Sequence, residues 1–125
     1  MVNPSVEDHR SHVRPIPEVR WEDSWGAIAS DGAGNFGIVT DFSSKRKAKN
    51  AAIAECRKRG GGMCVVRLEF LNQCAAVVVS TQWAESANGP TVEEAVQAGT
   101  QGCGNSDTGK CWVYWTGCSM AKRVW

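Results

Sequence analysis

The chain contains an internal repeat that keeps its cysteines in register. The spacing of Cys56 and Cys64 recurs 47 positions later, at residues 103 and 111. The same shift superimposes Phe36 on Trp83, Ser44 on Thr91, Ala48 on Ala95, Ala51 on Ala98 and Val66 on Val113. Self-similarity at a fixed period indicates one supersecondary unit that is used twice. The repeat therefore predicts two equivalent units, over about residues 25–71 and 72–119.

Each unit is predicted to contain two strands, a helix and a further strand. The elements expected in the first unit are a strand over 25–30, a turn over 31–35, a strand over 36–40, a helix capped by Ser44 over 45–58, a glycine stop at 60–62 and a strand over 64–70. Those expected in the second are a strand over 74–81, a bend or strand start at 82–84, a turn over 88–90, a helix capped by Thr91 over 92–102, a polar loop over 104–110 and a strand over 111–116. The alanines expected to face inward are Ala48, Ala51 and Ala52 in the first helix and Ala95 and Ala98 in the second.

These elements predict an α+β fold of two ββα-β units, in which a mainly antiparallel sheet packs against two helices. The 125 residues fit one domain, which we place at residues 21–125. Residues 1–20 contain three prolines and no hydrophobic periodicity, so we expect them to form an extended or disordered arm.

Six cysteines in a small domain predict three disulfides and an oxidising compartment, periplasmic or extracellular. No basic, apolar leader is visible, so we expect a mature or trimmed form that lacks its export signal. Because repeated cysteines should pair equivalently, we expect Cys56–Cys64, Cys103–Cys111 and, stapling the ends of the two units, Cys74–Cys118. Zinc is the competing interpretation, but the chain has no C-x-x-C, and its histidines, His9 and His12, lie far upstream.

Charge and hydropathy exclude two classes of partner. The net charge of +1 creates no global field that would recruit nucleic acid or an anionic membrane. No apolar run approaches the roughly 20 residues of a membrane helix.

No catalytic residue or cofactor is predicted. The expected folded body contains no histidine, and oxidised cysteines supply no thiolate nucleophile. Serines 43, 44, 80 and 86 lie at the ends of elements, where helix capping or turn formation explains them. Glu93 and Glu94 lie in the first turn of a helix, where negative charge favours the helix dipole. The other carboxylates, Asp41, Glu55 and Glu69, are scattered along the sequence. The segment Gly32–Gly37 matches G-x-G-x-x-G, but a strand follows it instead of a helix, which favours a hairpin turn over a nucleotide site.

Two surfaces are candidates for binding. The first helix carries a basic run that includes Lys45, Arg46 and Lys49, whereas the second helix begins with Glu93 and Glu94. This charge difference indicates a solvated face, a cationic patch for an acidic partner protein, or a site for phosphate groups.

The second candidate surface is the aromatic segment 112–115. Strand alternation places Val113 and Trp115 on a core face, and Trp112 and Tyr114 on the other. The repeat aligns Tyr114 with Arg67. We therefore expect these outward-facing residues either to form a binding surface or to be covered by the N-terminal arm or a partner chain.

The chain resembles the bacterial secreted family called domain of unknown function 4189 over about residues 21–120. The resemblance is carried by Trp25-Gly-Ala-Ile-Ala, the Ser-x-x-x-Ala helix that ends in Cys56, Asn72-Gln-Cys-Ala-Ala76, Thr91-Val-Glu-Glu-Ala95 and Gly117-Cys-Ser119. It implies a bacterial protein that follows an export signal, and it transfers no catalytic residue.

A rigid scaffold without a recognisable active site predicts a protein-binding module. Its most concrete form is an immunity or inhibitor protein that occludes a partner toxin enzyme. A small secreted effector or hydrolytic enzyme and a structural envelope protein are the alternatives. The partner and the oligomeric state stay open.

Overall fold

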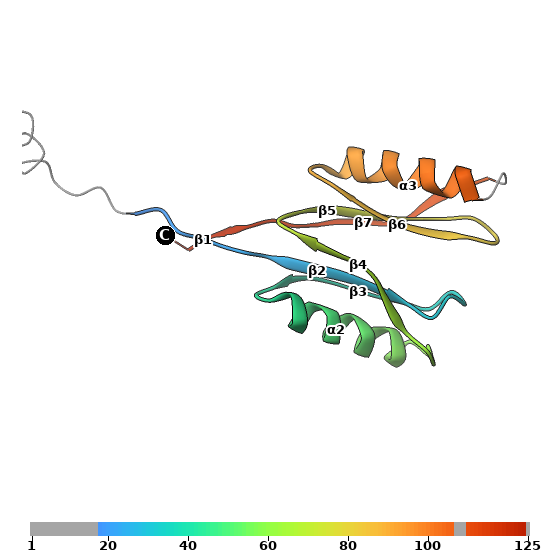
Figure 1. The fold of residues 1–125 in the computed structure, drawn as a ribbon, viewed down its shortest axis with the longest axis horizontal. Helices are drawn as coiled ribbons and strands as arrows, with labels where there is room; N and C mark the ends of the chain where they lie inside the picture. Colours follow the sequence, from blue (N-terminus) through green and yellow to red (C-terminus); the bar gives the residue numbers. More distant parts are fainter. Residues whose placement is uncertain (1–17, 107–109, 125) are drawn as a thin grey trace, which may run out of the picture.

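The chain folds into four layers, in the order helix, sheet, sheet, helix (Figure 1). The computed structural model describes residues 18–106 and 110–124. The first unit forms β2 (Trp25–Ser30), β3 (Phe36–Phe42), α2 (Lys45–Lys58) and β4 (Val65–Leu71). The second forms β5 (Gln73–Val79), β6 (Ala84–Gly89), α3 (Val92–Ser106) and β7 (Trp112–Ser119). The predicted order of two strands, a helix and a strand is confirmed in both units.

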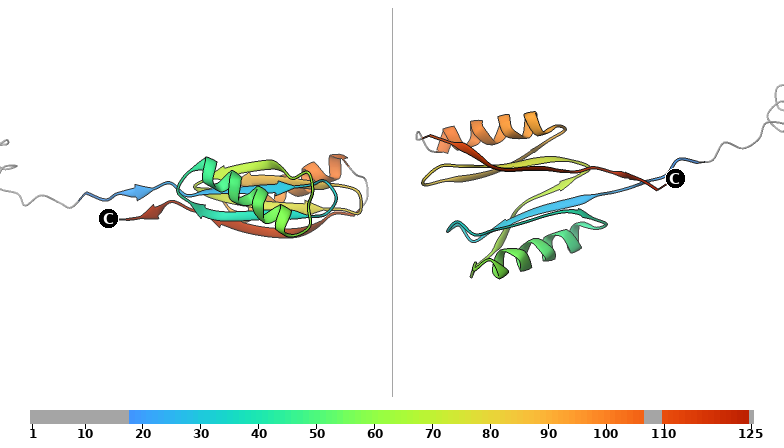
Figure 2. Two further views of the ribbon diagram at one scale, coloured as in Figure 1. Left: turned by 90° about the horizontal axis from the view of Figure 1, so that it is seen from below. Right: turned by 180° about the vertical axis from the view of Figure 1, so that it is seen from behind.

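Each unit builds its own three-stranded antiparallel sheet. The strand orders are β3-β2-β4 and β6-β5-β7, so the first strand of each unit lies at the centre of its sheet. The two sheets face one another, and each helix covers the outer face of its own sheet (Figures 1 and 2). The predicted α+β class is confirmed, with the antiparallel sheet divided between the two units.

Strand β2 shows how the two sides of a sheet are used. Alternate residues Ala27 and Ala29 pack under α2, whereas Ile28 between them points at the other sheet. The helix side is filled mainly by small residues, because α2 lies close to the strands. The core between the sheets is larger in side-chain volume and consists of Ile28, Phe36, Phe70, Ala75 and Val77.

Helix α2 has the predicted caps. The Ser44 Oγ accepts a hydrogen bond from the Lys47 backbone N–H at 3.2 Å, which satisfies one of the unpaired amides of the first turn. At the other end, Gly60 adopts φ 105°, and the Gly61 N–H donates to the Cys56 carbonyl at 3.0 Å. A left-handed glycine with this six-residue hydrogen bond is a Schellman stop, so the glycine run ends the helix as expected.

Helix α3 is longer than the sequence suggested. It runs to Ser106, so its predicted end at residue 102 is wrong, as is the loop from residue 104. Its buried positions are Ala95, Gly99 and Cys103, each four residues apart, and Ala98 is exposed. Packing at this spacing and the Cys103 disulfide keep the glycine-rich last turn helical. Tertiary contacts therefore outweigh the low helix propensity of these residues.

The strand ends of the second unit also differ. The predicted turn at Asn88 and Gly89 is wrong, because both residues continue β6 and pair with Ala75 and Cys74 of β5. Strand β7 extends to Ser119 and not to residue 116, since it pairs with β5 over its whole length. Pairing with a central strand therefore overrides the local turn signal.

All three predicted disulfides are present. Cys56–Cys64 and Cys103–Cys111 each tie the end of a helix to the strand that follows. The third bond, Cys74–Cys118, joins register neighbours in β5 and β7. It therefore lies within the second unit, and the expectation that it would staple the two units together is wrong.

A short two-stranded ribbon, formed by the first and last strands, extends from one end of the sandwich (Figure 2). It pairs β1 (Trp21–Glu22) with β8 (Lys122–Arg123), and the Val124 N–H donates to the Arg20 carbonyl at 2.9 Å. This pairing was not predicted. Residues 1–17 of the predicted arm lie outside the described residues. None of the described helices is long and apolar enough to cross a membrane.

Candidate binding cleft

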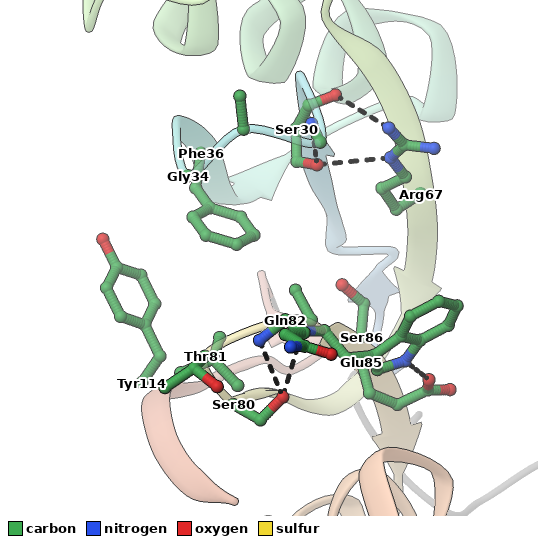
Figure 3. Close-up of a pocket in the computed structure, with 15 residues that line it drawn as sticks. Ser30, Gly34, Phe36, Arg67, Ser80, Thr81, Gln82, Glu85, Ser86 and Tyr114 are labelled. Carbon is green, nitrogen blue, oxygen red and sulfur yellow. Dashed lines mark hydrogen bonds between the residues drawn. The ribbon is translucent and has the colours of Figure 1, made fainter. Parts of the chain in front are cut away.

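A cleft of about 870 Å³ opens between the two sheets, at the end opposite the ribbon. Its walls are the tip of the β2–β3 hairpin, the tip of the β5–β6 hairpin and side chains from β4 and β7 (Figure 3). The volume falls in the range of about 300–1,000 Å³ that is usual for ligand sites. Both sequence repeats therefore contribute to one site.

Two β-bulges aim one side chain from each unit into the cleft. In the first sheet, Leu68 pairs with Ile28 and Val66 with Ala29, which leaves Arg67 as the extra residue of β4. In the second sheet, Trp115 pairs with Val77 and Val113 with Val78, which leaves Tyr114 as the extra residue of β7. Arg67 and Tyr114 are equivalent in the repeat, and both line the cleft. Bulges commonly redirect a side chain next to a functional site.

The bulge corrects the predicted faces of β7. Val113 is opposite Val78, which contacts α3 at Gly99, whereas Trp115 is opposite Val77 and packs between the sheets. The prediction that Val113 and Trp115 share a core face is therefore wrong, because the extra residue interrupts the alternation.

Tyr114 contacts the ring of Phe36 across the two sheets, with ring centroids 5.1 Å apart. Trp112 is opposite Val79, a residue that lines the cleft. Trp112 therefore lies at the end of the molecule where the cleft opens. Both predicted aromatic residues are half exposed, at 50% for Trp112 and 51% for Tyr114.

Arg67 is held on the wall of the cleft by Ser30. Its Nε donates to the Ser30 Oγ at 3.3 Å and its Nη2 donates to the Ser30 carbonyl at 3.4 Å. Ser30 is buried, and its Oγ also accepts the Gly32 N–H at 3.1 Å. One edge of the guanidinium is therefore fixed to the hairpin.

The tip of the β5–β6 hairpin carries a tryptophan and a carboxylate. The Ser80 Oγ accepts the backbone N–H groups of Gln82 at 3.2 Å and Trp83 at 3.0 Å, which shapes the turn. The Trp83 Nε1–H donates to the Glu85 Oε1 at 2.9 Å. Trp83 and Glu85 are thereby joined as one polar and aromatic group at the rim. Neither residue was predicted as a site, because the sequence marks Trp83 only as the repeat partner of Phe36 and gives Glu85 no distinguishing pattern.

The tip of the β2–β3 hairpin explains the glycine motif. Gly32 and Gly34 adopt φ 76° and 100° in the turn, and Phe36 and Gly37 already belong to β3. The interpretation as a hairpin turn is confirmed. The Asp31 carboxylate closes this turn by accepting the Asn35 Nδ2–H at 2.7 Å and the Ala33 N–H at 2.8 Å.

These hydrogen bonds make the turn sensitive to pH. The Asn35 side chain, followed by the Ala33 and Asn35 amides, holds the pKa of the Asp31 carboxyl below its ordinary value of 3.8. A carboxyl whose pKa is lowered in the folded state stabilises the fold above its unfolded pKa, and this contribution is lost as the pH falls through the folded pKa. The Asp31 contribution is therefore present from about pH 5 upward and disappears in more acidic solution.

We expect Asp31→Asn to lower the melting temperature at neutral pH, because a side-chain amide has one acceptor oxygen and cannot accept both the Ala33 N–H and the Asn35 Nδ2–H. The difference from the unaltered chain should shrink as the pH falls below about 4. Thermal unfolding at a series of pH values measures this. A difference that stays constant down to strongly acidic pH would show that the carboxylate charge has no part in the turn.

The predicted basic residues lie apart from the aromatic ones. Lys45, Arg46 and Lys49 are on α2, and none of them lines the cleft. Lys45 is instead placed over the ring of Trp25, with Nζ 5.6 Å from the centroid. The structure thus brings Arg67 together with Tyr114 in one cleft that Lys45, Arg46 and Lys49 do not line.

A buried hydroxyl pair at the opposite end of the sandwich is the second polar cluster. The Oγ atoms of Ser24 and Ser119 lie 2.6 Å apart, and the Ser119 Oγ also accepts the Asp41 N–H at 2.9 Å. Asp41 adopts φ 70°, and its Oδ1 lies 3.3 Å from the Ser24 Oγ. Both hydroxyls are fully buried, so no substrate reaches them. We interpret the cluster as a structural feature that holds the two sheets together at the point where the ribbon begins.

Removing one member should leave buried polar groups without partners. We expect Ser119→Ala to lower the free energy of unfolding by about 1–3 kcal/mol, because the Asp41 N–H and the Ser24 hydroxyl each lose a partner. Urea unfolding measures the change. Ser106→Ala, at the exposed end of α3, is the control and should change stability by less than about 0.5 kcal/mol.

Metal binding finds no support in the described part of the chain. Residues 18–106 and 110–124 contain no group of three or more side chains suited to hold a metal ion. The two histidines of the chain, His9 and His12, lie outside these residues. All six cysteines are paired as disulfides.

Comparison with known proteins supports the fold and the family. No curated protein matches the chain. Among solved structures, the NMR structure of Rv1813c from Mycobacterium tuberculosis is similar, with a TM-score of 0.53 and 21% sequence identity over 84% of this chain and 80% of that one. At this identity the likeness concerns the fold alone. The model of the family described as "Domain of unknown function (DUF4189)" matches residues 25–118, and the chain therefore belongs to this family.

Proposed function

We propose that the chain is an extracytoplasmic protein-binding module that works through the hairpin end of the sandwich. The observation that carries the proposal is the pair of equivalent bulges, which aim Arg67 and Tyr114 into one cleft. Three disulfides in so small a protein agree with a periplasmic or secreted location.

The hairpin end of the sandwich has the composition of a protein interface. Trp83, Trp112 and Tyr114, here called the aromatic surface, are 45%, 50% and 51% exposed. Tryptophan, tyrosine and arginine are the residues that most often dominate binding energy, because they bury a large area at a low cost in side-chain entropy. An exposed group of this kind next to a cleft supports binding to another protein.

The lining of the cleft favours binding over acid–base chemistry. Glu85 is the sole carboxylate among the lining residues, which include neither a histidine nor a thiol. Hydrolysis by paired carboxylates needs two such groups, and nucleophilic catalysis needs a base within reach of the nucleophile. The most concrete role that this composition supports is that of an immunity or inhibitor protein which occludes a partner enzyme.

Alanine substitutions test the proposal. We expect Trp112→Ala to reduce capture of the partner from an extracytoplasmic extract at least about tenfold, with little change in melting temperature, because the side chain is half exposed. Tyr114→Ala should weaken capture similarly and also lower stability by about 1 kcal/mol through loss of the Phe36 contact. Mass spectrometry quantifies the captured protein.

Trp21→Ala is the matched control, because Trp21 is 62% exposed on the ribbon at the far end of the molecule. It should leave capture unchanged. If Trp112→Ala and Trp21→Ala reduce capture equally, or neither does, the hairpin end is not the binding surface.

A further inference from the structure

We infer that the partner docks by adding an extended, uncharged segment as a further β-strand to the outer edge of β7. This inference rests on the proposed function and specifies how the partner is held. It comes from two features on the same side of the sandwich, an edge strand without a charged residue and a pocket beside that strand.

Strand β7 is the least protected edge of the two three-stranded sheets. Their edge strands are β3 and β4 in the first sheet and β6 and β7 in the second. Proteins commonly place charged residues on edge strands, because these discourage pairing with another chain. Such residues are present in β3 (Asp41), β4 (Arg67 and Glu69) and β6 (Glu85). Strand β7 is eight residues long, has the sequence WVYWTGCS and contains none.

The backbone of β7 offers hydrogen-bonding groups on its outer side. Cys118 lies opposite Cys74 of β5, with the Cα atoms 3.8 Å apart. Close spacing marks an antiparallel pair whose residues do not hydrogen bond to one another. Because the pairing is regular from Trp115 to Ser119, Thr116 is a position of the same kind. The N–H and C=O groups of Thr116 and Cys118 therefore point away from β5, where no described strand pairs with β7.

A pocket of about 370 Å³ lies beside this edge. It is lined by Phe36, Ile38, Arg59, Tyr114 and Trp115. Strands β3 and β7 contact one another across the two sheets and follow the same side of the sandwich (Figure 2). Phe36 belongs to the core between the sheets, and Ile38 and Trp115 pack against it. The pocket therefore opens onto the margin of that core and suits a large apolar side chain.

The surroundings favour an uncharged segment. Arg59 is the sole charged residue that lines the pocket, and its Nε forms an ion pair with the Glu55 Oε2 at 2.9 Å. At the start of β7, Trp112, Val113 and Tyr114 are 50%, 44% and 51% exposed. An added strand would cover part of this apolar surface, and a charge on it would lose water there without gaining a free partner.

Strand addition uses both features. Backbone hydrogen bonds to the edge supply affinity, and pockets for alternate side chains supply specificity. Successive side chains of a strand point to opposite faces, so every second side chain of the added segment would lie on the side of β3 and the pocket. The inference therefore names an extended segment with apolar side chains at alternate positions, one of them large.

Three blocked nonapeptides test the inference on the full chain. The first alternates threonine with valine, has phenylalanine at its centre and carries a lysine at each end for solubility. The second has the same side chains but is methylated on the three central backbone nitrogens, and the third has alanine in place of phenylalanine. We expect both changes to weaken binding at least about tenfold in NMR titrations, because methylation removes backbone donors and alanine leaves the pocket empty.

Hydrogen exchange locates the added strand. In the unliganded chain, the amides of Thr116 and Cys118 should exchange fast, whereas the amide of Gly117 between them bonds to β5 and should exchange slowly. The first peptide should slow the exchange of Thr116 and Cys118 at least about tenfold. Gly117 is the internal control and should not change.

A proline variant removes the outward donor from the edge. Thr116→Pro should weaken binding of the first peptide at least about tenfold, and proline is tolerated on an edge strand where the N–H faces solvent. Val65→Pro, at the exposed first residue of β4, is the matched control and should leave the affinity unchanged. If Thr116→Pro disturbs the fold, the methylated peptide and the exchange rates on the unaltered chain decide alone.

The outcomes separate this inference from the proposed function. Equal affinities for the methylated and unmethylated peptides, or no slowing at Thr116 and Cys118, overturn strand addition, and capture through Trp112 still stands or falls on its own test. Strand addition together with partner capture that is indifferent to Trp112→Ala supports the edge and overturns the proposed use of the aromatic surface. A dimer of the chain alone that Thr116→Pro dissociates in analytical ultracentrifugation overturns the inference, because the edge would then bind a second copy.

Discussion

Replacing Gly37 with alanine is expected to lower the free energy of unfolding by about 3 kcal/mol, the upper part of the range for overpacked cores. A Cβ atom at this position would lie 1.9 Å from the Ala52 carbonyl oxygen and 2.4 Å from the Cys56 nitrogen. Both atoms belong to the backbone of α2, which cannot move aside as a side chain can. The whole helix would have to shift away from β3, although the Cys56 disulfide ties its end to β4.

Gly104→Ala provides the control within the second unit. Gly104 lies in α3, and a Cβ atom there has no neighbour within 4 Å. Alanine has the higher helix propensity, so this variant should be neutral or more stable by up to about 1 kcal/mol. Urea unfolding followed by tryptophan fluorescence compares the two. A Gly37→Ala variant as stable as Gly104→Ala would show that β3 and α2 are not in contact as described.

Removal of the Cys74–Cys118 bond is expected to cost about 4 kcal/mol, the largest loss among the three disulfides. The bond closes a loop with a sequence separation of 44, whereas the separation is 8 for each of the others. A disulfide lowers the conformational entropy of the unfolded chain, and this effect grows with the length of the closed loop. The resulting stabilisation of the folded state is about 4 kcal/mol for the long loop and about 2.5 kcal/mol for each short one. The double variant Cys74→Ala with Cys118→Ala removes the bond and measures its contribution to stability.

The matched control is the double variant Cys103→Ala with Cys111→Ala, which removes a bond from the same unit. Urea unfolding under non-reducing conditions measures both. The expected order is a larger loss for the first double variant. Equal losses, or a larger loss for the short loop, would show that local packing at the cysteines outweighs the restriction of the unfolded chain.

The repeat made much of the fold predictable. Equivalent cysteines paired equivalently, and Ser44 and Gly60 mark the helix ends through hydrogen bonds that local residue types determine. The turn at Asp31 was predictable for the same reason, because a short polar side chain followed by glycines closes such a loop on its own.

The remaining features depend on contacts between segments that are distant in the chain. A bulge arises from the register of two strands, so alternation along β7 alone could not place Tyr114 and Trp115 on the same side. The ribbon pairs Trp21 with Arg123, and the hydroxyl pair joins Ser24 to Ser119. No periodicity or spacing marks such partners in a single sequence.

The candidate site was predictable in part for this reason. Arg67 and Tyr114 were found because the repeat aligns them and because their residue types favour binding. Trp83 and Glu85 line the cleft because β6 pairs with β5 and the tip of the β5–β6 hairpin faces the tip of the β2–β3 hairpin. The basic residues of α2 also form a candidate surface in the sequence, but the fold places their helix on the outer face of the first sheet.

Site-specific photo-crosslinking tests most directly whether the hairpin end is the working surface. A photoreactive phenylalanine analogue placed at Trp112, and in a separate chain at Trp21, keeps an aromatic group at each exposed position. We expect an adduct with a different protein from position 112 in the producing organism and none from position 21. Adducts from position 21 alone would contradict it, because the ribbon would then be the surface that meets the partner.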